Sequence, residues 1–172
     1  MMSRPPLEMG WDRSRGWIDQ YDRMLRWHAR LVTADGEATL DDGWAYDYWD
    51  TAFAFFQNSY HLKDWIKFEH PELGPAAEMF VANDPALAYC ADVCNGTKHR
   101  EVTRGNRQPG HLAAIREYAP WERTGQRFAI IGPDGSQPVL PLASRCVEAW
   151  RLFVADQLSE SSREPGSTPA HP

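Results

Sequence analysis

The chain has 172 residues and a formal charge of -6, which suits one domain and argues against a protein that coats nucleic acid non-specifically. No stretch approaches the roughly 20 apolar residues that cross a bilayer, and the first residues lack the apolar run of a secretory signal. We therefore expect a cytoplasmic protein without membrane contact, whose three cysteines are reduced thiols.

The amino-terminal half predicts two long helices. Residues 1–14 are polar and proline-bearing, and we expect them to be disordered. Apolar side chains at three- and four-residue intervals then predict an amphipathic helix, with the stripe Trp17, Ile18, Tyr21, Met24, Leu25, His28 and Leu31. Residues 32–43 contain two glycines and four acids and predict a loop. An aromatic segment without glycine or proline follows and predicts a central helix from about 46 to 68.

The next elements are marked by helix-start and turn residues. Residues 70–83 predict a turn and a short helix. Asp84 followed by Pro85 is typical of a helix start, with Asp as the N-cap and Pro at the first helical position. We expect this helix to end near Asn95, with Gly96 as its stop.

The carboxyl-terminal part predicts a loop, a hairpin and a last helix. Residues 101–125 are punctuated by Gly and Pro, and "RFAII" and "SQPVLPL" read as two extended runs around a turn, which predicts a β-hairpin. Residues 142–158 predict the last helix, and we expect 159–172 to be a disordered tail. The predicted fold class is mainly α: a single domain over 15–158, a bundle of about four to five helices with one β-hairpin before the last helix.

Polar side chains form a line along the aromatic helix. At about 100° per residue, Asp50, Gln57, His61 and Asp64 fall within roughly 60° of one another, and Tyr60 lies at one edge. A buried polar group without a partner costs about 1 to 3 kcal/mol, so these groups must be paired or used.

The same projection brings Asp92, Asn95 and His99 together on the next long helix if it continues through the glycine. We hypothesise that the two polar lines face each other across an inter-helix cleft, with His61 and Asp64 opposite Asn95 and His99. The alternative is structural, because such pairs are often surface contacts and a histidine on an apolar face is often a hydrogen-bonded core residue.

The two cysteines near this line allow two further readings. Cys90, Cys94, His99 and His61 could hold zinc, although structural zinc sites more often have a second cysteine pair elsewhere. Cys94 could be a nucleophile with His99 as its base, but the carboxyl-terminal end of a helix disfavours an anion. Packing in the core is the alternative for both thiols.

General acid–base chemistry fits the stretch better. His99 could exchange a proton near neutral pH, Asn95 could orient a substrate, and Lys98 or Arg100 could hold a phosphate. Residues 98–111 carry four basic side chains and one acid, which favours contact with phosphate or RNA. A solvated loop would show the same composition.

The stretch "CNGTKH" resembles the motif of the HEPN superfamily, helical bundles that include prokaryotic toxin and defence ribonucleases. Asn95 matches the polar position and His99 the histidine, while Cys94 stands where the family has its catalytic arginine. His61 and Asp64 resemble the polar residues that a preceding helix adds to the site. The chain also resembles uncharacterised bacterial proteins that contain "YHLKDW" and "CNGTKH".

The resemblance implies a homodimeric domain that binds RNA or nucleotide phosphate, with metal-independent endoribonuclease activity in a defence or toxin system. The alternatives are a non-catalytic interaction module, such as an antitoxin or adaptor, and a metal-dependent hydrolase. We expect no cofactor and no metal for the first reading. The predicted catalytic residues are His99, Asn95, His61 and Asp64. The predicted substrate-binding residues are Tyr60, Lys98, Arg100 and Arg104.

Overall fold

The computed structural model describes residues 15–36, 42–98, 114–117, 128–132 and 135–158. Within these residues it has five α-helices and three strands: α1 (Gly16–Gly36), α2 (Asp42–Glu69), α3 (Gly74–Asn83), α4 (Pro85–Lys98), β1 (Ala114–Glu117), β2 (Phe128–Gly132), β3 (Gly135–Pro138) and α5 (Val139–Phe153). The predicted class, a mainly helical bundle with a hairpin before the last helix, is confirmed. The two ends that were predicted to be disordered lie outside the described residues.

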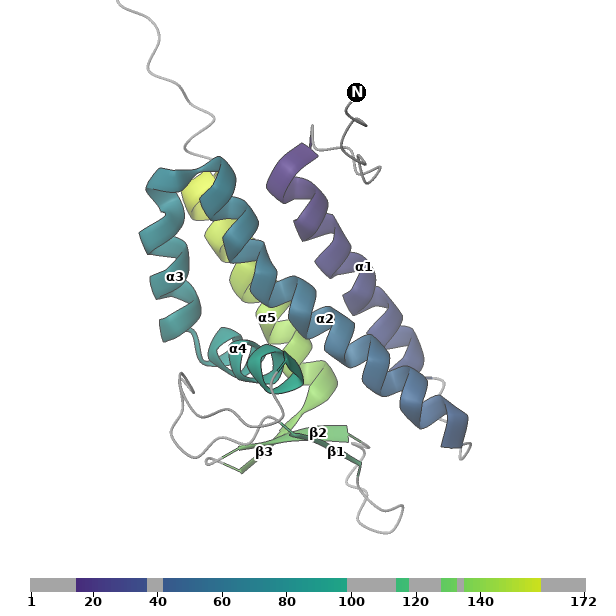
Figure 1. The fold of residues 1–172 in the computed structure, drawn as a ribbon. Helices are drawn as coiled ribbons and strands as arrows, with labels where there is room; N and C mark the ends of the chain where they lie inside the picture. Colours follow the sequence, from purple (N-terminus) through teal and green to yellow (C-terminus); the bar gives the residue numbers. More distant parts are fainter. Residues whose placement is uncertain (1–14, 37–41, 99–113, 118–127, 133–134, 159–172) are drawn as a thin grey trace, which may run out of the picture.

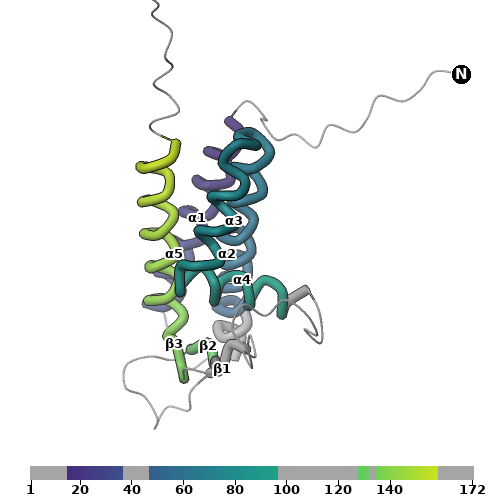
Figure 2. Tube along the Cα trace, turned by 90° about the vertical axis from the view of Figure 1, so that its left-hand side faces the viewer, coloured from purple at the N-terminus to yellow at the C-terminus, as the bar shows by residue number. Residues whose placement is uncertain are grey.

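Helix α2 is the central element of the bundle, as its aromatic composition predicted. It contacts α1, α3, α4 and α5, and Figure 1 shows α1 and α2 running side by side while α4 crosses near the end that faces the sheet. Figure 2 shows α5 standing to one side of the other helices and leading up from the sheet. No helix in the described part of the chain is both long and apolar enough to cross a bilayer.

The core is built from the apolar stripes that the sequence pattern indicated. Its largest fully buried side chains come from all five helices and from β2, and they include Met24, Leu31, Phe55, Phe56, Leu62, Ile66, Val81, Leu87, Ile130 and Trp150. Burying a side chain of this size contributes about 1.5 to 3 kcal/mol, so this shared core holds the helices at fixed positions. The candidate site therefore rests on rigid elements.

The loop predicted for residues 32–43 is largely wrong. Helix α1 continues to Gly36 and α2 begins at Asp42, so most of that segment is helical. The Tyr48 hydroxyl of α2 donates a hydrogen bond to the Asp35 carboxylate of α1 at 3.2 Å. This tertiary contact ties the last turn of α1 to α2, and no pattern of neighbouring residues reveals it.

Two other helix boundaries also differ from expectation. Helix α4 continues through Gly96 to Lys98, although a glycine inside a helix costs about 1 kcal/mol relative to alanine, and Asn95 and Gly96 are half-buried. Helix α5 begins at Val139, so part of the second predicted extended run is helical. Val139 is fully buried, and its burial favours this earlier start.

The hairpin of β2 and β3 carries a third strand. Strand β1 lies within residues 101–125, which were predicted to be a loop, and it pairs antiparallel with β2 so that Ala114 faces Ile131. The Phe128 ring of β2 stacks on the Tyr48 ring of α2, with centroids 4.2 Å apart and planes at 15°. This stack fixes the sheet against the helical bundle.

Candidate functional site

Helices α2 and α4 are in contact at His61, a member of the polar line predicted on α2. The His61 Nε2 atom of α2 lies 3.8 Å from the Cys94 Sγ atom of α4. The His61 side chain is exposed, whereas Cys94 is only 7% exposed. The pair therefore joins a solvent-facing imidazole to a thiol at the edge of the core, and Asn95 follows at a half-buried position.

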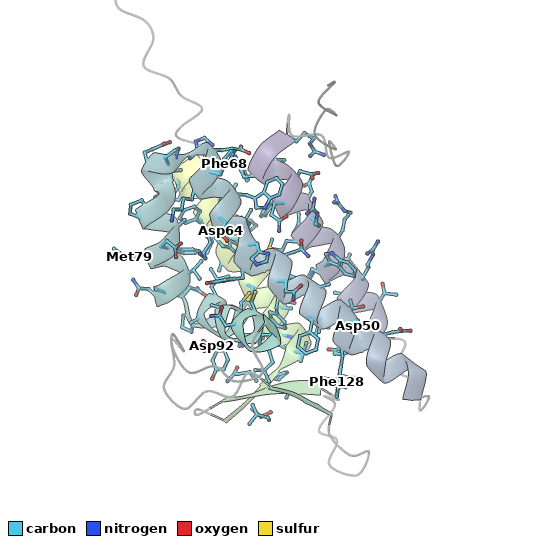
Figure 3. All side chains as sticks on the ribbon, viewed as in Figure 1. Asp50, Asp64, Phe68, Met79, Asp92 and Phe128 are labelled. Atoms are coloured by element: carbon cyan, nitrogen blue, oxygen red, sulfur yellow. The ribbon has the colours of Figure 1, made fainter. Side chains whose placement is uncertain are left out.

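The remaining members of the α2 line do not form a buried seam. Asp50, Gln57 and Asp64 are exposed, and Figure 3 shows Asp50 and Asp64 on opposite halves of α2. The expectation that these polar side chains of the aromatic helix are buried is thus wrong. Neighbouring helices cover the other sides of α2, and this strip is the one that faces water.

Asp64 takes part in a different contact, centred on Lys63. The Lys63 ammonium lies 2.8 Å from the Glu78 carboxylate of α3, 3.1 Å from that of Asp64, and 4.8 Å from the centre of the Tyr60 ring. Burial alone lowers the pKa of Lys63, but the hydrogen bonds to Glu78 and Asp64 outweigh it and hold the pKa above its usual value. Asp64 and Tyr60 are thereby tied to the α2–α3 contact.

The polar line predicted on α4 is divided between the core and the surface. Asp92 is 1% exposed and lies within the protein, while Asn95 is half-buried. Figure 3 shows Asp92 on α4, well away from Asp64. Lys98 is the last residue of α4, with its side chain outside the description, and the other predicted residues outside it are His99, Arg100 and Arg104.

The other two cysteines lie deep in the core. Cys90 Sγ donates to the Phe56 carbonyl at 3.1 Å, and Cys146 Sγ of α5 donates to the Ala86 carbonyl at 3.3 Å. Burial, with Cys90 beside it, raises the pKa of Cys146 well above its usual value. The three cysteines form no disulfide.

His28 has a structural role, in line with its place in an apolar stripe. Its Nε2 atom lies 3.0 Å from the Ser144 hydroxyl of α5, and that hydroxyl donates to the Leu140 carbonyl. Burial lowers the pKa of His28. The serine proton is thus directed to the backbone, so the pair ties α1 to α5.

Two hollows lie elsewhere on the surface. A groove of about 610 Å³ runs between α3 and the end of α5, with Met79, Phe80, Leu152 and Phe153 among its lining residues. A second hollow of about 470 Å³ lies where α1 begins and α2 ends, lined by Gly16, Asp64, Trp65, Phe68 and Glu69. Neither contains the His61 and Cys94 pair, so the predicted cleft between the polar lines is not one of them.

Comparison with known protein families, curated proteins and solved structures finds no match to this chain.

Among the residues that the structure describes, no three His, Cys, Asp or Glu side chains are placed to hold a metal ion. The site is therefore assigned from its own geometry. The projection along α2 and α4 found His61 and Asn95, but it did not show that Cys94 faces His61.

Proposed function

We propose that the chain is a cytoplasmic, homodimeric HEPN-like domain that binds RNA or a nucleotide through phosphate at the α2–α4 contact around His61. The contact of His61 with Cys94 carries this proposal. It brings an exposed imidazole to the position of α4 at which the motif-like stretch begins.

The side chains at this contact suit a phosphate ligand. An imidazole at the surface can donate a hydrogen bond to a phosphate oxygen and can serve as a general acid or base. Asn95 adds an amide donor one residue beyond Cys94, and it is half-buried rather than enclosed. An open surface of this kind admits a chain of nucleotides.

Binding without cleavage is the second candidate, and one observation favours it. Cys94 stands at the position of the family's arginine, and its thiol cannot supply a guanidinium charge. The buried cation on α2, Lys63, is already held by two carboxylates. We therefore rank phosphate binding ahead of ribonuclease activity.

The test of binding uses a fluorescein-labelled single-stranded RNA and fluorescence anisotropy at low salt with EDTA. His61→Ala should raise the Kd about five- to tenfold, because one charge-assisted contact is lost. His70→Ala is the matched control, since His70 lies beyond the end of α2 and contacts Glu72. No binding by the wild type, or equal affinities of the two variants, would contradict the proposal.

The test of cleavage incubates the same proteins and His99→Ala with mixed RNA in EDTA. Products that form with the wild type and disappear with His99→Ala would support an endoribonuclease. Intact RNA in every sample, together with the expected anisotropy, would identify an RNA-binding module. Light scattering after size-exclusion chromatography measures whether the protein is a homodimer.

A further inference from the structure

The three cysteines differ in the group that each thiol meets. Cys90 and Cys146 are 0% exposed, and their thiols donate to backbone carbonyls. Cys94 is 7% exposed and faces the His61 imidazole nitrogen at 3.8 Å. A carbonyl oxygen cannot take up a thiol proton near neutral pH, whereas a neutral imidazole can.

The imidazole also connects this thiol to solvent. His61 is exposed on α2, so a proton that it accepts from Cys94 can pass to water or to a leaving group. The thiols of Cys90 and Cys146 lie inside the core. Of the three cysteines, Cys94 is the one whose thiol contacts an imidazole, and it is 7% exposed where the other two are 0% exposed.

Three electrostatic effects act on a thiolate at this position, and the first is the desolvation of the buried thiol, which disfavours the ionised form. Cys94 lies in the carboxyl-terminal half of α4 (Pro85–Lys98), where the helix dipole disfavours an anion by up to about thirtyfold at a partly buried position. A neighbouring imidazolium favours the thiolate by about tenfold to a thousandfold, because an opposite charge within about 4 to 6 Å stabilises the ionised form. An imidazolium beside the sulfur therefore opposes both the helix dipole and the desolvation of the thiolate.

We propose that Cys94, activated by His61, is a modification site that forms a mixed disulfide with a small disulfide such as oxidised glutathione. The Cys94 thiol gives its proton to His61 Nε2, and its sulfur attacks one sulfur of the small disulfide. The bond between the two sulfurs of the ligand breaks as the new bond forms. The other half leaves as a thiolate and takes the proton, so Cys94 is oxidised and that half is reduced.

The first experiment incubates the folded, full-length chain with oxidised glutathione near neutral pH and follows it by intact mass and peptide mapping. We expect one glutathione per chain, bound to Cys94. Cys90 and Cys146 should react only after the protein is unfolded in urea. Reaction of all three cysteines at one rate in the folded protein, or of none of them, would overturn the proposal.

The second experiment tests the imidazole. His61→Asn keeps a polar, exposed side chain without the base, and it should slow the reaction of Cys94 about tenfold. His70→Asn is the control and should react like the wild type. A His61→Asn protein that reacts as fast as the wild type would remove the imidazole from the proposal. The order in which the three cysteines of the wild type react with oxidised glutathione tests the proposal even if the His61→Asn protein does not fold.

Discussion

Two polar side chains on α2, only two residues apart, are used in opposite ways. Lys63 is 7% exposed, points toward α3 and is held by Glu78 and Asp64. His61 is exposed, and its contacts are a long one with the Cys94 thiol of α4 and a ring contact with Tyr60. The lysine stabilises the fold, whereas the histidine remains able to contact a ligand.

The difference follows from what each group would cost if it were left alone. A buried ammonium without a partner is expensive, so a sequence that places one in the interior must surround it with carboxylates. An exposed imidazole keeps its water and needs no partner. A polar residue on a helix therefore indicates function more strongly when the fold does not need its hydrogen bonds.

Among changes to the polar contacts of α2, the largest effect should come from breaking the Lys63 contact. Glu78→Gln leaves a buried ammonium with only Asp64 as a charged partner at hydrogen-bonding distance, and it should lower the free energy of unfolding by about 2 kcal/mol. Urea denaturation followed by tryptophan fluorescence measures this. Glu72→Gln, in an exposed pair with His70, should change it by about 0.5 kcal/mol or less. Equal effects of the two variants would show that Lys63 is not structural.

A smaller loss in the free energy of unfolding is expected at high pH, where Lys63 loses its proton. The folded pKa of Lys63 lies above its usual 10.5, so its contribution is fully present below 10.5 and is lost as the pH rises through the folded value. Burial raises the pKa values of Tyr48 and Tyr21 above 10.0, so the protein also loses their contribution to its stability as the pH rises. Urea denaturation across this range should therefore show a steeper loss for the wild type than for Lys63→Met. Parallel curves would contradict the role given to Lys63.

The sequence predicted the helices well because their signals are local. The apolar stripe of α1 and the Asp84–Pro85 start of α4 depend on residues a few positions apart. Strand β1 and the last turn of α1 depend instead on partners distant in sequence, the pairing with β2 and the hydrogen bond from Tyr48. These elements could not be read from local pattern alone.

The site was predicted in part for a related reason. A helical projection gives the angles between Asp50, His61 and Asp64, but it does not show which side of the helix its neighbours cover. It therefore placed in the interior a strip that faces water, and it gave no role to Lys63, which is buried. The sequence named the residues of the contact, but only packing shows which of them meet.

The smallest effect on the free energy of unfolding should come from changing His61. His61→Ala should change the free energy of unfolding by about 0.5 kcal/mol or less, because the ring is exposed and its contact with Cys94 is long. Leu62→Ala, one position along and 0% exposed, should cost about 2 to 5 kcal/mol in the same urea titration. A loss above about 1 kcal/mol for His61→Ala would make His61 a structural residue like Lys63. A near-zero value leaves its imidazole available for phosphate and for the Cys94 proton, so that changes in either assay report on the site itself.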